Sequence, residues 1–106
     1  MPRQVSPLLH QTSPYDEFDA AAYPLDLTGW GSAHPAFVAA LTQLRPKLII
    51  EVGTWKGGSA LYMAAIARKL ELDCEIVCVD TFLGSHEHWL DPTLKRDLAI
   101  CNGRPQ

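Results

Sequence analysis

Residues 47–64 read KLIIEVGTWKGGSALYMA and contain the change from strand to helix from which the rest of the fold follows. The run from Leu48 to Val52 is short, rich in β-branched residues and apolar on both faces until Glu51, as buried parallel strands tend to be. A glycine-rich turn follows. From Ser59 to about Leu70 an alanine-rich amphipathic stretch predicts a helix, which ends in two cations where the helix dipole favours them.

The flanking segments extend this unit into an α/β domain. Residues 75–80, EIVCVD, repeat the strand pattern, so strand, turn, helix and strand form a right-handed βαβ unit with a parallel sheet. A helix is predicted over about residues 35–45. Pro35 favours its first turn, and Pro46 ends it. Asp91-Pro92 predicts the cap of a helix over roughly 93–101, with Asn102-Gly103 as its stop. Residues 1–30 predict an N-terminal arm, and residues 31–106 the domain.

Composition restricts the class of protein. The chain has 106 residues, 9 Lys+Arg, 12 Asp+Glu and a net charge of -3. This length supports one domain, and the slight acidity offers no surface for nucleic acid or an anionic membrane. Without a membrane-length apolar stretch or a signal-peptide core, we expect a cytoplasmic protein. The three cysteines lack metal or redox spacing and are expected to be reduced packing residues.

The turn between strand and helix carries the predicted chemistry. Gly53 permits a sharp turn, while Gly57 and Gly58 let a ligand approach backbone N–H groups at a helix N-terminus, which favours an anion. Glu51, before the turn, is an acceptor for a cationic group. A site with both features suits a zwitterion. Asp80 ends the second strand, where nucleotide-binding α/β folds place the acid that binds ribose hydroxyls.

Two familiar nucleotide motifs fit this turn poorly. The dinucleotide motif G-x-G-x-x-G is not met, because the residues from Gly53 read G-T-W-K-G-G and place Trp55 in the tight turn. A P-loop needs a lysine after the glycines, whereas Lys56 precedes them. NAD and ATP are therefore both disfavoured.

The pattern Glu51-x-Gly53-x-x-x-Gly57-x-Ser59, followed by Asp80, resembles class I S-adenosylmethionine-dependent methyltransferases. The longer string KLIIEVGTWKGGSALYMA…IVCVDTFLGSHEHW is similar to the methyltransferase-24 and cephalosporin-hydroxylase-like group, over about residues 28–106. The resemblance implies a partial Rossmann-like class I methyltransferase fold, with S-adenosylmethionine as cofactor and a small-molecule acceptor as substrate.

The resemblance also implies roles for single residues. Asp80 would bind the ribose hydroxyls, Glu51 would face the amino group of the cofactor through water, and Ser59 would lie near its carboxylate. Thr81 or Phe82 would line the adenine. For Asp80 the alternative is a loop acid without a ligand, and for Ser59 a helix-start residue that satisfies backbone donors. The residues expected to bind the cofactor are Glu51, Gly53, Thr54, Gly57, Ser59, Asp80, Thr81 and Phe82.

Four further side chains, Trp55, His34, His86 and His88, have both a structural and a functional interpretation. Trp55 is expected to pack over the turn rather than cap the cofactor. His34, before Pro35, is expected at a helix start rather than in a catalytic dyad. His86 and His88, with Glu87, Asp80 and Asp91 nearby, lie in a predicted loop without a third fixed ligand, so no metal site is predicted.

Two function hypotheses follow. A complete methyltransferase of the resembled class has more strands than this sequence, so we expect a truncated or split N-terminal half without the acceptor-binding and catalytic part. In the first hypothesis the chain binds S-adenosylmethionine as part of a small-molecule O-methyltransferase. In the second it is a non-catalytic fragment or structural remnant that associates with a partner. Catalytic residues and methyl acceptor are not specified, and an exposed first strand predicts self-association or a complementing chain.

Overall fold

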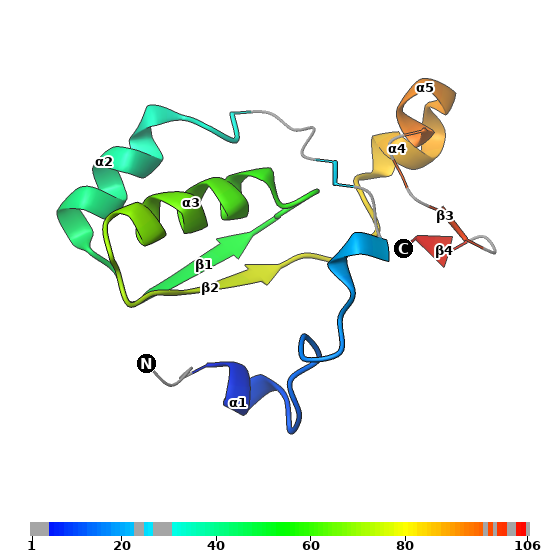
Figure 1. Cartoon of the computed structure of the whole chain (residues 1–106). Helices are drawn as coiled ribbons and strands as arrows, with labels where there is room; N and C mark the ends of the chain where they lie inside the picture. Colours follow the sequence, from blue (N-terminus) through cyan, green and yellow to red (C-terminus); the bar gives the residue numbers. More distant parts are fainter. Residues whose placement is uncertain are drawn as a thin grey trace.

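The computed structural model describes residues 5–22, 25–26, 31–96, 98, 100–101 and 104–105 (Figure 1). The elements, in chain order, are the helices and strands α1 (Ser6–Leu9), the 3-10 helix η1 (Ala20–Ala22), α2 (Pro35–Leu44), β1 (Leu48–Val52), α3 (Gly58–Lys69), β2 (Glu75–Val79), α4 (His86–Leu90), α5 (Pro92–Lys95), β3 (Ile100–Cys101) and β4 (Arg104–Pro105). The order helix, strand, helix, strand over residues 35–79 confirms the predicted α/β unit.

Strands β1 and β2 are parallel and pair in register from Leu48 with Glu75 to Val52 with Val79. Helices α2 and α3 lie on one side of this sheet in Figure 1. The buried core lies between them and the sheet, and consists of Leu41, Met63, Ile66 and Ala67. Side chains alternate across a strand, so Ile49 and Ile76 pack against this core while their strand neighbours point away from it.

The ends of α2 form as the sequence predicts. His34 is the N-cap, and its Nδ1 accepts a hydrogen bond from the Ala36 N–H at 3.0 Å. The helix ends at Leu44 with Arg45 in the left-handed region at φ 44°, just before Pro46. The helix-start reading of His34 is therefore confirmed.

Two expectations for the C-terminal segment are wrong. The segment with His86 and His88 is the helix α4 rather than a loop, and the predicted helix over 93–101 ends at Lys95. Asp91 does cap α5, since it accepts from the Thr93 N–H at 2.8 Å. Beyond it, Ile100–Cys101 pairs antiparallel with Arg104–Pro105. The stop predicted at Asn102-Gly103 falls on two residues that lie outside the described part.

The N-terminal arm contains two short helical turns, α1 and η1, and contacts the βαβ unit. The Glu75 carboxylate accepts hydrogen bonds from Val5 N–H at 3.1 and 3.2 Å and from Ser6 N–H at 3.4 Å. Within the described residues, no helix is long and apolar enough to cross a membrane.

In the described part of the chain, β1 pairs with β2 along one edge, and its other edge has no strand beside it. Ile50 and Val52 are 61% and 81% exposed. Because an unpaired apolar edge pairs readily, we expect the chain to self-associate at micromolar concentration. Light scattering measures this directly, and a monodisperse 11.7 kDa species with cooperative thermal unfolding would contradict the expectation.

Candidate functional site

The site predicted from the sequence lies at the carboxyl ends of β1 and β2, where the turn of residues 53–57 leads into α3. Gly53 has φ 82° and Gly57 has φ 83°, both in the region that favours glycine. The Gly53 N–H donates to Val79 O at 2.8 Å and so extends the ladder between the strands by one bond. A Cβ at either glycine would meet nothing within 4 Å, so open space lies beside both positions.

Asp80 holds this turn in place. Its Oδ2 accepts hydrogen bonds from the Thr54 N–H at 2.7 Å and the Trp55 N–H at 3.0 Å, and its Oδ1 accepts from the Phe82 N–H at 3.0 Å. The Phe82 N–H and then the Trp55 N–H are the main causes that lower the pKa of Asp80. The carboxylate at the end of one strand therefore fixes the loop after the neighbouring strand, a structural role that no local sequence pattern indicates.

This contact makes stability depend on pH. The folded pKa of Asp80 is below its unfolded value of about 3.9, so its contribution is complete above that value and is lost as pH falls through the folded pKa. We expect the difference in free energy of unfolding between the wild type and Asp80→Asn to be constant near neutral pH and to shrink in acid. Urea unfolding as a function of pH measures it.

Asp73→Asn, in the connection before β2, is the control for loss of one surface charge. If the free-energy difference for Asp80→Asn does not change between neutral and acidic pH, the Asp80 carboxylate does not hold the turn as an anion.

Glu51 is engaged by its own neighbours. Its two carboxylate oxygens accept hydrogen bonds from the hydroxyls of Thr54 and Ser59, and the Cys78 Sγ lies 3.9 Å from Oε2. Thr54 is buried, at 8% exposure. Glu51 thus ties the turn to the first turn of α3. The Ser59 hydroxyl, expected near a ligand carboxylate, donates to Glu51, which leaves the Ser59 backbone N–H at the helix start for that role.

Helix α3 begins with open donor groups. Its N-cap is Gly57, which has no side chain to cap the helix. The first N–H groups of a helix lack intrahelical acceptors and carry partial positive charge. The N-terminus of α3, reached across the open space at Gly57, is therefore suited to an anionic group.

Trp55 lies in the turn and packs against α4. Its ring stacks on His88 with centroids 4.4 Å apart and an interplanar angle of 23°. His88 is 7% exposed, and its Nδ1 accepts from the Ser85 N–H at 3.1 Å while the Ser85 Oγ lies 2.6 Å from the same nitrogen. His88 is thus a packing and capping residue of α4. Within the described residues, no group of three or more His, Cys, Asp or Glu could hold a metal ion.

The remaining predicted residues follow Asp80. Thr81 Oγ1 accepts from the Leu83 N–H at 3.3 Å, and Phe82 adopts φ 56° with 62% of its surface exposed. Thr81 and Phe82 directly follow Asp80, whose carboxylate accepts hydrogen bonds from the turn and from the Phe82 N–H. Cys74 and Cys78 are free and half-buried, and Cys74 packs against the core; burial raises the pKa of the Cys74 thiol. The side chain of Cys101 lies outside the described part.

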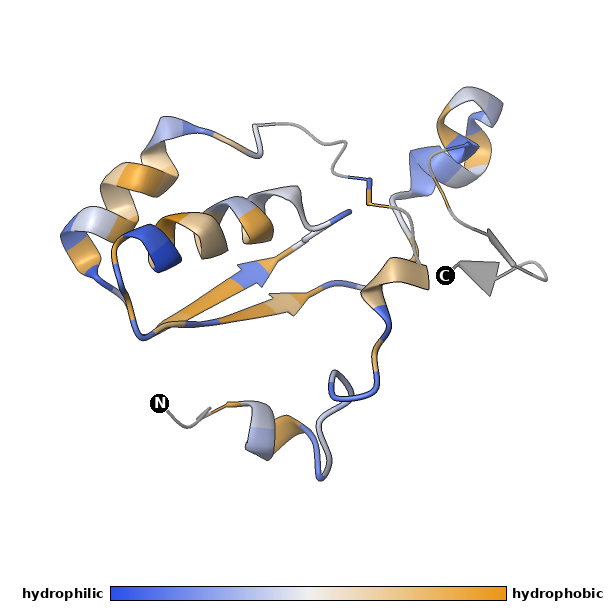
Figure 2. Cartoon of the chain, viewed as in Figure 1, coloured by the Kyte–Doolittle hydropathy of each residue, from blue (hydrophilic) through white to orange (hydrophobic). Residues whose placement is uncertain are grey.

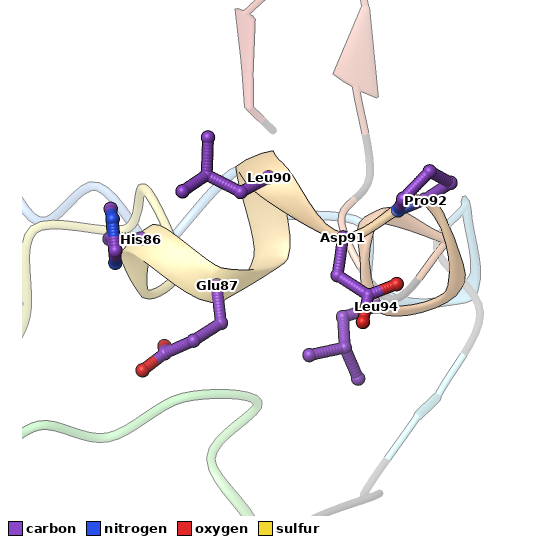
Figure 3. Close-up of a pocket in the computed structure, with 6 residues that line it drawn as sticks. All are labelled: His86, Glu87, Leu90, Asp91, Pro92 and Leu94. Carbon is purple, nitrogen blue, oxygen red and sulfur yellow. The ribbon is translucent and has the colours of Figure 1, made fainter.

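A hollow of about 550 Å³ lies along α4 and α5 (Figure 3). It is lined by His86, Glu87, Leu90, Asp91, Pro92 and Leu94, and by no residue of the turn. The Ser85 side chain is the main cause that lowers the pKa of the Glu87 carboxyl. Two carboxylates at this hollow repel an anion, whereas the N-terminus of α3 attracts one. The turn is therefore the better site for a ligand with a carboxylate.

Comparisons with known proteins identify a family for this chain. Residues 31–97 match the family model described as Rhamnosyl O-methyltransferase/CmcI. Curated relatives named rhamnosyl O-methyltransferase, from Mycobacterium tuberculosis strain H37Rv and Mycobacterium bovis strain BCG, are 42% identical over 57 residues. That alignment covers 54% of this chain and 22% of each relative, so the chain spans about a fifth of their length. No solved structure matches the chain. The chain belongs to the rhamnosyl O-methyltransferase/CmcI family of methyltransferases.

Proposed function

We propose that the turn of residues 53–59 and the loop of residues 80–82 bind S-adenosylmethionine, as part of a protein that methylates a hydroxyl oxygen of a small molecule. The observation that carries this proposal is the pair of hydrogen bonds from Thr54 and Trp55 to Asp80, because they shape an open glycine turn against the N-terminus of α3. Family membership supports methyl transfer as the chemistry.

The residues present fit such a cofactor. Each oxygen of a carboxylate has two lone pairs, so the Oδ1 of Asp80, which accepts from Phe82, can accept a second bond from a ribose hydroxyl. The exposed ring of Phe82 offers a face for a purine. The cofactor carboxylate would lie at the N-terminus of α3. The Glu51 carboxylate, fixed by two hydroxyls, supplies negative charge near the cofactor's cationic groups.

When bound, S-adenosylmethionine would supply an electrophilic methyl group for an acceptor hydroxyl, with the sulfonium sulfur as leaving group and a base taking the hydroxyl proton. The residues of this chain would contribute by binding and orienting the cofactor. The name of the mycobacterial relatives suggests a hydroxyl of a rhamnosyl group as the methyl acceptor, and we propose this acceptor for the protein. We also propose that the protein acts in the cytoplasm.

Calorimetry with the full chain tests cofactor binding. We expect S-adenosylhomocysteine to bind and NAD to show no heat under the same conditions. Binding of NAD in preference to S-adenosylhomocysteine would contradict the proposal. Methyl transfer is a separate measurement, with labelled S-adenosylmethionine and a rhamnoside; binding without transfer would support the alternative of a non-catalytic binding unit.

A further inference from the structure

Trp55 adopts a backbone conformation in the turn that is unusual for an aromatic residue. Its φ is 53°, in the left-handed region, where a bulky residue persists only if its surroundings hold it there. Asp80 holds its backbone, because the Asp80 carboxylate accepts from the Trp55 N–H at 3.0 Å. This hydrogen bond does not restrict the side-chain torsions that set the direction of the ring. The direction of the Trp55 ring therefore depends on a second contact.

The second contact comes from α4. The ring of His88 stacks on the ring of Trp55, with centroids 4.4 Å apart and an interplanar angle of 23°. Stacked rings stabilise each other beyond the area that they bury. The loop before α4 packs against the same pair, because a Cβ at Gly84 would lie 3.6 Å from Trp55 Cζ3 and 3.7 Å from His88 Cβ. The Trp55 ring thus packs against both α4 and the loop that leads into it.

The ring of His88 is itself fixed. It is 7% exposed, and its Nδ1 accepts from the Ser85 N–H at 3.1 Å and lies 2.6 Å from the Ser85 Oγ. Its helix is attached to the preceding loop, since the Trp89 indole N–H donates to the Leu83 carbonyl at 2.7 Å. Helix α4 begins with hydrophilic residues (Figure 2), and among the described residues the hydrophobic core includes none of this helix. Specific side-chain contacts therefore place α4 against the turn.

We propose that His88 is a positioning residue for the turn of residues 53–57: from α4, its ring holds the ring of Trp55 and so the conformation of the turn. Without the stack, the turn would adopt its observed conformation in a smaller fraction of molecules, which lowers the apparent affinity for a ligand by that fraction. The effect on affinity rests on the proposed function, whereas the effect on the turn is present without a ligand. The candidate cofactor site thus depends on a helix outside the glycine turn and the loop after β2.

Two substitutions of His88 separate stacking from capping. His88→Gln removes the ring but keeps an acceptor for the Ser85 N–H, because Gln at this position completes a capping box. His88→Phe keeps a ring and removes the acceptor. In the unliganded chain, amide hydrogen exchange at Thr54 and Trp55 should be roughly 2- to 12-fold faster in His88→Gln and unchanged in His88→Phe. Both rates are taken relative to the N–H of Ile66 in the core, which reports global unfolding.

Calorimetry with S-adenosylhomocysteine measures the consequence for binding. His88→Gln should weaken affinity by the same roughly 2- to 12-fold, and His88→Phe should not. Trp55→Leu removes the other ring of the stack, so adding His88→Gln to it should cause no further loss. His10→Gln is the matched control, because it removes a ring that lies edge-on to Tyr15 in the N-terminal arm, with centroids 6.4 Å apart. It should change neither exchange nor affinity, and circular dichroism shows that each variant is folded.

The proposal is overturned if the exchange rates, or the affinity of a chain that binds, are the same in His88→Gln as in the wild type. It is also overturned if His88→Phe loses as much as His88→Gln, because His88 would then act only as a cap of α4. Additive losses from Trp55→Leu and His88→Gln would overturn it as well, since Trp55 would then contact the ligand by itself. A wild-type chain that does not bind S-adenosylhomocysteine would contradict the proposed function, and the exchange rates would then decide the role of His88.

Discussion

Replacing Gly53 by valine should abolish binding of S-adenosylhomocysteine while the chain remains folded. Gly53 has φ 82°, where a β-branched residue is strained by about 1 to 3 kcal/mol. In the structure a Cβ at this position meets no atom within 4 Å, so the valine side chain would project into the open space beside the turn. That space is where the proposed ligand lies. Calorimetry measures the affinity, and circular dichroism measures the fold.

Gly31→Val is the matched control for backbone strain. Gly31 has φ 62° and also has nothing within 4 Å of a Cβ, but it lies outside the turn. This variant should lose stability like Gly53→Val and keep normal affinity. A folded Gly53→Val chain that binds S-adenosylhomocysteine as tightly as the wild type would show that the turn is merely structural.

Replacing Asp80 by alanine should weaken binding of S-adenosylhomocysteine roughly 10- to 150-fold, which corresponds to charge-assisted hydrogen bonds of about 1.5 to 3 kcal/mol. Two effects contribute. The ribose hydroxyls lose their acceptor, and the N–H groups of Thr54 and Trp55 lose the carboxylate that holds the turn. The isothermal titration should be accompanied by thermal unfolding, which reports the second effect alone.

Asp91→Ala gives a matched comparison, because Asp91 also accepts a hydrogen bond from a backbone N–H, that of Thr93, and lies at the hollow rather than at the turn. The affinity of the Asp91→Ala variant for S-adenosylhomocysteine should equal that of the wild type. Unchanged affinity in Asp80→Ala, or a loss in Asp91→Ala instead, would remove Asp80 from the binding site.

Local patterns were sufficient to predict the βαβ unit and the position of the turn. The apolar run of β1, the glycines of the turn and the amphipathic stripe of α3 each lie within a few residues of one another, and each favours the observed element. Helix α4 was missed because Ser85 and His88 replace the usual pairing of serine with Glu or Gln at a helix start.

Contacts between distant segments were beyond such patterns. The position of Asp80 at the end of the second strand predicts that it lies beside the turn. It does not predict that the backbone N–H groups of Thr54 and Trp55 donate to its carboxylate. The hydrogen bonds of Val5 to Glu75 join residues 70 apart, and the stacking of Trp55 on His88 depends on the path of the loop between β2 and α4. These contacts depend on tertiary structure, and no periodicity in either segment indicates them.

The most direct measurement of the central claim is the change in backbone amide NMR shifts when S-adenosylhomocysteine is added to the full chain. We predict large changes at Thr54, Trp55, Ser59 and Phe82, because these N–H groups lie in the turn, at the helix start and after Asp80. NAD at the same concentration should leave them unchanged. Shifts confined to Glu87, Leu90 and Leu94 at the hollow, or equal shifts with NAD, would contradict the assignment of the turn as the cofactor site.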